Sequence, residues 1–117
     1  MHFICKFNDV KDGDAREFVL QDCAPHTLIV LKLAGEFHVY RNSCPHTGVN
    51  LNWMPHQFFD TEHRYLQCAM HGALFRPQDG YCVQGPCAGQ SLYQYACKVV
   101  DDSVYLQDTS HNQKEPL

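Results

Sequence analysis

The sequence predicts an all-β fold, and three observations lead to this prediction. Short segments of aliphatic, β-branched and aromatic residues recur along the chain, and several of them alternate apolar with polar residues. Turn-forming groups such as Asp12-Gly13-Asp14 and Ala34-Gly35 separate these segments. No segment of ordinary helix length has apolar residues at helical spacing. We therefore expect a β-sandwich or barrel as the base of the molecule.

The first part of the chain predicts two pairs of strands. Residues 3–7 alternate, and the turn at Asp12-Gly13-Asp14 precedes a second segment at 16–20. Residues 26–33 are rich in aliphatic and β-branched side chains, which favours a strand, and Ala34-Gly35 turns the chain into 36–41.

The second part predicts shorter strands and ends in another pair. A strand at 64–67 is followed by a hairpin of 73–76 and 81–83 around Gln78-Asp79-Gly80. The final predicted strands, 92–100 and 104–107, flank a turn at 101–103.

Size and composition indicate one globular domain. The 117 residues are 44% hydrophobic and 19% charged, which is typical of a folded domain. We expect a single domain over 1–108 and a flexible polar tail over 109–117. The net charge of −4 argues against a nucleic-acid surface. We also expect a monomer.

Cysteine content and the distribution of apolar residues predict the compartment. The first residues lack the basic start and apolar run of a signal peptide, and no stretch approaches the ~20 apolar residues of a membrane helix. Seven cysteines without an export signal favour a reducing compartment. We therefore expect a cytoplasmic protein that does not bind a membrane.

Two short motifs carry the candidate metal ligands. Cys44 and His46 lie in Cys44-Pro45-His46-Thr47-Gly48, and Cys68 and His71 lie in Cys68-Ala69-Met70-His71-Gly72. Two thiolates can hold one iron while two imidazoles hold the other, which is the ligand set of a Rieske [2Fe–2S] centre. Each pair fits in one short loop, so two facing loop tips can enclose a cluster.

Two other interpretations of these four residues stay open. Any one of them would ordinarily be a buried thiol or a core histidine. A Cys₂His₂ set also suits tetrahedral zinc, although zinc fingers place two cysteines before two histidines, whereas this chain alternates them.

The two motifs, together with Gly85-Pro86, resemble the three cluster loops of Rieske proteins. The resemblance implies a Rieske-like (ISP-domain) base with a small cluster-binding lobe inserted at about 43–89, and one [2Fe–2S] cluster per chain. Cys44 and Cys68 would bind the buried iron, and His46 and His71 the outer iron. Gly48 and Gly72 would allow backbone N–H groups to approach the sulfurs, and Gly85-Pro86 would cover the cluster. The 49–63 connection is longer than the family pattern.

Four positions distinguish this chain from respiratory Rieske proteins. Those proteins carry a disulfide between the cluster loops, but Val49 and Met70 stand at its positions here. They also place a serine and a tyrosine where this chain has Ala73 and Phe75. Without hydroxyl donors to sulfur, the potential should fall toward about −150 mV rather than about +300 mV. The pattern is similar to Rieske-type ferredoxins of bacterial oxygenases.

The resemblance implies an electron-transfer component rather than a complete enzyme. It would carry one electron from a reductase to an acceptor such as an oxygenase. A small non-catalytic subunit of a larger oxidoreductase, or a zinc-binding interaction module, are the alternatives.

The remaining cysteines, histidines and loop aromatics have simpler interpretations. Cys5, Cys23 and Cys97 fall near predicted strands and are expected to be buried thiols. Cys82 and Cys87 flank Gly85-Pro86, and their spacing is not that of a redox-active Cys-x-x-Cys, so inert thiols are expected. In the 49–63 connection, His56 and His63 are expected to be surface residues. The apolar side chains of this connection are expected to cover the cluster lobe; they are Trp53, Met54, Phe58 and Phe59.

Overall fold

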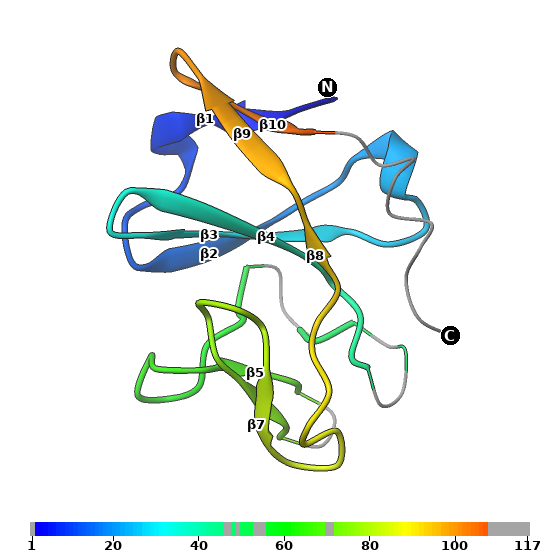
Figure 1. Cartoon of the computed structure of the whole chain (residues 1–117). Coiled ribbons are helices and arrows are strands. Elements are labelled where there is room, and N and C mark those ends of the chain that lie inside the picture. The colour runs from blue at the N-terminus through cyan, green and yellow to red at the C-terminus, as the bar shows by residue number, and fades with distance from the viewer. Residues whose placement is uncertain (1, 46–47, 49, 53–55, 70–71, 108–117) are drawn as a thin grey trace.

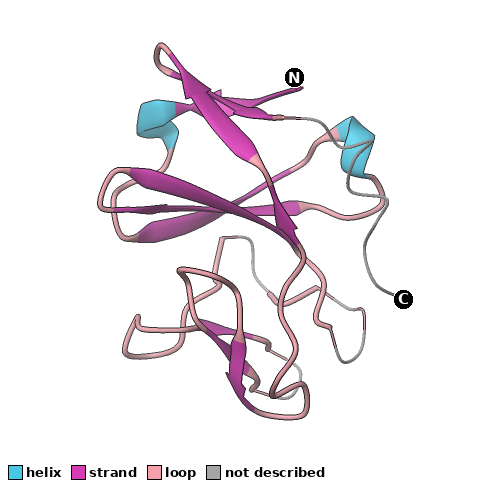
Figure 2. Cartoon of the chain, in the orientation of Figure 1, coloured by secondary structure: helices cyan, strands magenta, loops and turns pink. Residues whose placement is uncertain are grey.

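The computed structural model describes residues 2–45, 48, 50–52, 56–69 and 72–107, and it confirms the all-β prediction (Figures 1 and 2). Within these residues, ten strands form three antiparallel sheets, and two short 3₁₀ helices, Phe7–Asp9 and Gln21–Cys23, connect strands of the base. None of the described helices is long and apolar enough to cross a membrane. The predicted tail at 109–117 lies outside the described residues.

Two of the sheets form the base. The first has the order β1-β10-β9 and the second the order β2-β3-β4-β8. The strands of the first sheet are β1 (His2–Lys6), β9 (Cys97–Val100) and β10 (Ser103–Leu106). Those of the second sheet are β2 (Asp14–Phe18), β3 (Leu28–Leu33), β4 (Glu36–Arg41) and β8 (Gln94–Tyr95).

The third sheet belongs to a separate lobe below the base in Figure 1, formed by the segment between β4 and β8. Its strands, in the order β5-β6-β7, are β5 (Leu66–Gln67), β6 (Leu74–Phe75) and β7 (Cys82–Gln84). The predicted inserted lobe is therefore present.

Strand β3 is buried on both faces because the second sheet is the middle layer. Leu28 and Val30 contribute to the core between the two base sheets, whereas Ile29 and Leu31 contribute to the core between the base and the lobe. Alternate residues of a strand point to opposite faces, so a strand covered on both sides needs a continuous apolar run.

Several predicted strands differ from the structure in their bounds, and two of these differences have a clear physical reason. The segment 92–100 divides at Ala96, with β8 in one base sheet and β9 in the other. The second strand begins at Asp14 rather than Arg16, since its ladder with β3 already starts with Asp14 opposite Lys32.

Candidate functional site: two matched cysteine loops

The first cysteine loop follows directly after β4. Cys44 is buried, with 2% of its surface exposed. Its carbonyl accepts a hydrogen bond from the backbone N–H of Gly48 at 2.7 Å, and the Oγ of Ser43 donates to the Gly48 carbonyl. Gly48 has a φ of +78°, a conformation that favours glycine.

The second loop repeats this construction after β5. Cys68 is completely buried, and its carbonyl accepts a hydrogen bond from the N–H of Gly72 at 2.8 Å. Gly72 has a φ of +72°. In each loop a bond over four residues therefore closes the segment that contains the predicted histidine ligand. The N–H groups of the two glycines themselves donate to the cysteine carbonyls.

Backbone and side-chain bonds join the two loops. The N–H of Ala69, next to Cys68, donates to the carbonyl of Leu51 at 2.7 Å, and the N–H of Leu51 donates to Oδ1 of Asn42 at 2.8 Å. Cys44 and Cys68 also belong to the same buried cluster. The loops are thus fixed relative to each other as well as internally.

Asn42 was not identified from the sequence. Its buried amide donates to Asn52, Thr27 and Glu17, and Asn52 and Thr27 also donate to the Glu17 carboxylate. This network connects β2, the residue directly before β3, and the first cysteine loop. A polar residue two positions before the first cysteine was the only signal, and it does not distinguish a buried network from a surface position.

A third loop packs against the second. A Cβ atom at Gly85 would lie 2.7 Å from the Cα of Ala73, so this close approach requires glycine. The segment continues as a turn, in which the N–H of Ala88 donates to the Gly85 carbonyl. Ala73 follows Gly72, and the loop containing Gly85-Pro86 therefore rests on the end of the second motif.

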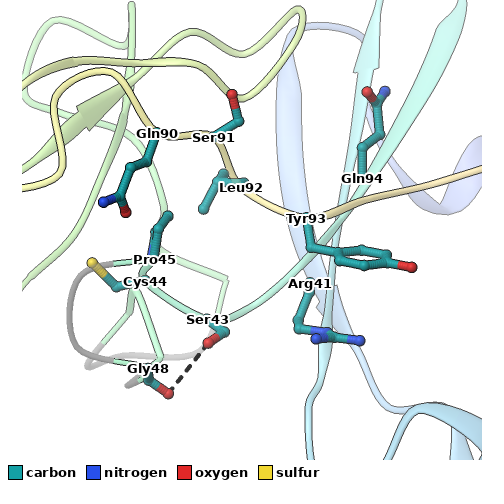
Figure 3. Close-up of a pocket in the computed structure, with 10 residues that line it drawn as sticks. All are labelled: Arg41, Ser43, Cys44, Pro45, Gly48, Gln90, Ser91, Leu92, Tyr93 and Gln94. Atoms are coloured by element: carbon teal, nitrogen blue, oxygen red, sulfur yellow. Dashed lines mark hydrogen bonds between the residues drawn. The ribbon is translucent and has the colours of Figure 1, made fainter. Parts of the chain in front are cut away.

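A cavity of about 820 Å³ opens beside the first loop (Figure 3). Cys44, Pro45 and Gly48 line it from one side, and the 90–94 segment lines it from the other. The first loop is therefore accessible from this side although Cys44 itself is buried.

Of the four predicted ligands, the structure brings Cys44 and Cys68 into one buried cluster. His46 and His71 lie outside the described residues, as do Val49, Trp53, Met54 and Met70. Among the described residues, no group of three or more histidine, cysteine or acidic side chains is arranged to hold a metal ion. Two buried thiols from adjoining loops fit the sulfur-bound half of a [2Fe–2S] cluster, since thiolates are its ligands.

The other cysteines are buried or half-buried, as predicted. Burial raises the pKa of Cys5 to about 11 and also raises the pKa of Cys23 and of Cys97. Burial raises the pKa of Cys87 to about 12, with further contributions from Cys82 and Cys44.

The 49–63 connection is attached to the base by two histidines. Nδ1 of His56 accepts a hydrogen bond from the N–H of Glu17 at 3.0 Å, and Nε2 of His63 lies 2.9 Å from the Gly13 carbonyl. Both histidines are exposed, as predicted. Phe58 is buried in the lobe core and Phe59 packs against it, which confirms the covering role of these two residues.

Comparison with known proteins gives a consistent result. The family model for the Rieske [2Fe–2S] domain matches residues 1–104. The ferredoxin component of the alkene monooxygenase system of Xanthobacter autotrophicus is 31% identical over 77 residues, which are 66% of this chain. The matched region spans 57% of that relative's length.

Solved structures share the fold. The ferredoxin of Sphingomonas yanoikuyae B1 matches with a TM-score of 0.69 and 23% identity, over 91% of this chain and 96% of that one. The ferredoxin of carbazole 1,9a-dioxygenase from Nocardioides aromaticivorans IC177 matches with a TM-score of 0.68 and 17% identity, over 89% and 93% of the two chains.

Proposed function

Because this chain belongs to the Rieske [2Fe–2S] domain family, we propose that it carries single electrons from a reductase to an acceptor such as an oxygenase. Its cofactor is a Rieske-type [2Fe–2S] cluster, one per chain, which takes up and releases one electron. The similar alkene monooxygenase relative is itself a ferredoxin component. The chain then acts as the electron-transfer component of a multicomponent oxidoreductase, and not as the complete enzyme.

The proposed ligands are Cys44 and Cys68 on the buried iron and His46 and His71 on the outer iron. The observation that supports this assignment is the pair of matched turns, each starting at a buried cysteine and closed by a glycine N–H. Such turns hold both sulfurs in fixed positions inside the lobe. The burial of both cysteines excludes water from the sulfurs, and exclusion of water is one of the factors that set a cluster potential.

The proposed potential is low. Ala73 and Phe75 are both buried in the lobe core, and neither side chain offers a hydroxyl donor to a cluster sulfur. Fewer hydrogen bonds to sulfur stabilise the reduced cluster less. A low-potential carrier suits the delivery of electrons to an oxygenase.

Domain organisation and location complete the proposal. We propose a single domain over 1–108 with the cluster lobe at about 43–89, a tail at 109–117, a monomeric state and a cytoplasmic location. The location is supported by the seven cysteines, none of which is in a disulfide in the structure.

Metal analysis of anaerobically purified protein tests this function. We expect iron and acid-labile sulfide in equal amounts, two of each per chain as the family cofactor requires, and reduction by one electron. A colourless protein that contains zinc would overturn the proposal. Copurification with one large enzyme and no turnover as a free carrier would favour a non-catalytic subunit instead.

His71→Cys tests the ligand assignment separately. Exchanging imidazole for thiolate adds negative charge, so the midpoint potential should fall and the visible spectrum should change. His63→Cys is the matched control, because His63 lies in the 49–63 connection, outside both cysteine motifs, and its side chain contacts the Gly13 carbonyl of the base. An unchanged spectrum in His71→Cys would remove His71 from the ligand set.

A further inference from the structure

Two buried thiols outside the proposed ligand set lie in direct contact. Sγ of Cys87 is 3.1 Å from Sγ of Cys82, and both side chains are completely buried in the lobe core. Sγ of Cys82 in turn lies 3.3 Å from the carbonyl oxygen of Gln84. The thiol of Cys87 therefore donates to Cys82, and the thiol of Cys82 donates to a carbonyl.

The backbone holds the two cysteines on opposite sides of one narrow turn. The N–H of Cys82 donates to the Gln90 carbonyl at 2.8 Å, and the Cys82 carbonyl accepts from Gly89 at 3.1 Å. On the other side, the Cys87 carbonyl accepts from the N–H of Gln90 at 2.9 Å. These bonds keep the sulfurs together while the turn packs on Ala73.

We propose that Cys82 and Cys87 form a reversible disulfide when the protein meets hydrogen peroxide. A disulfide needs sulfurs about 2.05 Å apart, so the pair has to close by roughly 1 Å from its separation of 3.1 Å. The backbone bonds that bring the two residues together are compatible with this small movement.

The chemistry is balanced by the peroxide. One thiol loses its proton and its thiolate attacks the peroxide; the sulfur becomes a sulfenic acid, and the hydroxide that leaves takes up the proton as water. The second thiol displaces a second water as the S–S bond forms, so both thiol protons end in water and the peroxide takes up two electrons. Complete burial of both side chains favours an oxidant as small as hydrogen peroxide over a bulky disulfide such as oxidised glutathione.

Mass spectrometry of the intact holoprotein tests the proposal. The protein is treated anaerobically with hydrogen peroxide, unfolded at neutral pH in excess alkylating reagent, and cleaved before Asp79 and Asp101. The resulting 79–100 peptide contains Cys82, Cys87 and Cys97. A Cys97→Ser background therefore leaves only the proposed pair in it.

After peroxide treatment, this peptide should carry no alkyl group and should be lighter than the reduced, unalkylated peptide by the mass of two hydrogens. Alkylation should return after reduction. Oxidised glutathione should give less of the cross-linked peptide over the same time. Cys82→Ser and Cys87→Ser should each leave the remaining thiol alkylated. Cys23 is the internal control. Its thiol interacts with Tyr95 and Arg41 rather than with the proposed pair, so it should stay alkylated throughout.

Three results would overturn the proposal. The first is full alkylation of Cys82 and Cys87 after peroxide treatment. The second is a cross-link of Cys87 to Cys44. The third is a Cys82–Cys87 cross-link that forms only in molecules that have lost their visible absorption and iron. The test does not depend on which side chains bind the iron, since neither member of the pair is a proposed ligand.

Discussion

The backbone of Gly85 lies so close to Ala73 that a Cβ atom at position 85 would be 2.7 Å from the Cα of Ala73. This close approach packs the Gly85-Pro86 loop on the second cysteine loop. Two stretches of backbone thus touch with no side chain between them. Because the two stretches are already in contact, any larger residue at position 85 has to displace the loop.

Gly85→Ala should destabilise the protein and speed the loss of the cluster. The added methyl group clashes with backbone, and the φ of +109° is strained for any side chain, so we expect a loss of about 1–3 kcal/mol. Urea unfolding and the decay of visible absorption measure the two effects. Gly89→Ala is the matched control, because it has a φ of +93° but nothing within 4 Å of its Cβ position. Equal effects of the two variants would show that the contact with Ala73 is unimportant.

Tyr40→Phe should weaken the attachment of the lobe to the base. The buried Tyr40 hydroxyl on β4 donates to the Pro77 carbonyl at 2.7 Å, and burial raises the pKa of this tyrosine, which keeps it a donor at alkaline pH. The variant leaves a buried carbonyl unpaired, at a cost of about 1–3 kcal/mol in the free energy of unfolding. Tyr105→Phe, on β10 of the base, should cost about 0.5 kcal/mol or less. Equal unfolding midpoints for Tyr40→Phe and the wild type would contradict this role.

Asn42→Ala should loosen the first cysteine loop. The variant removes the acceptor of the Leu51 N–H and the donor to Glu17 and Asn52, so we expect a loss of about 1–3 kcal/mol. Iron release to a chelator should also become faster, because Leu51 bonds the second loop through Ala69. Asn50→Ala, at an exposed position, is the control and should release iron at the wild-type rate. If Asn42→Ala released iron at the wild-type rate, the Asn42 network would have no role in retaining the cluster.

Phe75→Tyr should raise the midpoint potential. The new hydroxyl would supply a donor to cluster sulfur, and one hydrogen bond of about 1.4 kcal/mol corresponds to roughly 60 mV for a one-electron couple. Protein-film voltammetry measures the shift. Phe3→Tyr adds the same hydroxyl to an exposed side chain of the base and should leave the potential unchanged. A potential that stays at the wild-type value in both variants would show that position 75 is not beside the sulfurs.

The β6–β7 hairpin should lose stability in acid through Asp79. Arg76 bonds its carboxylate, and this bond, together with the N–H of Tyr81, holds the pKa of Asp79 below its ordinary value. A lowered folded-state pKa contributes stability above the ordinary carboxyl pKa, and this contribution is lost as the pH falls through the folded-state value. The difference in unfolding midpoint between wild type and Asp79→Asn should therefore be small and should shrink below about pH 4. A difference that grows in acid would contradict this assignment.

Local residue patterns were sufficient to predict most strands and both cysteine loops. The apolar run in β3 reflects the burial of this strand on both faces. The glycine after each motif reflects a positive φ at that position. Both requirements can be recognised from a few neighbouring residues. The division of 92–100 leaves no such trace. Leu92 enters the lobe core and Tyr95 the base core, and both are apolar, so the pattern looks like one strand.

Long-range partners explain what the sequence did not predict at the site. The role of Asn42 depends on Glu17, Thr27 and Asn52, which meet it only after the base sheet has formed. The bonds from His56 and His63 to the base likewise join positions far apart in the chain.

The two-sided burial of β3 has a consequence for how the molecule denatures. Its odd and even residues form a common wall between the interiors of base and lobe, so neither interior keeps its packing once that wall is lost. Base and lobe should therefore melt as one cooperative unit, and a destabilising change deep in the base weakens the protection of the cysteine loops as well.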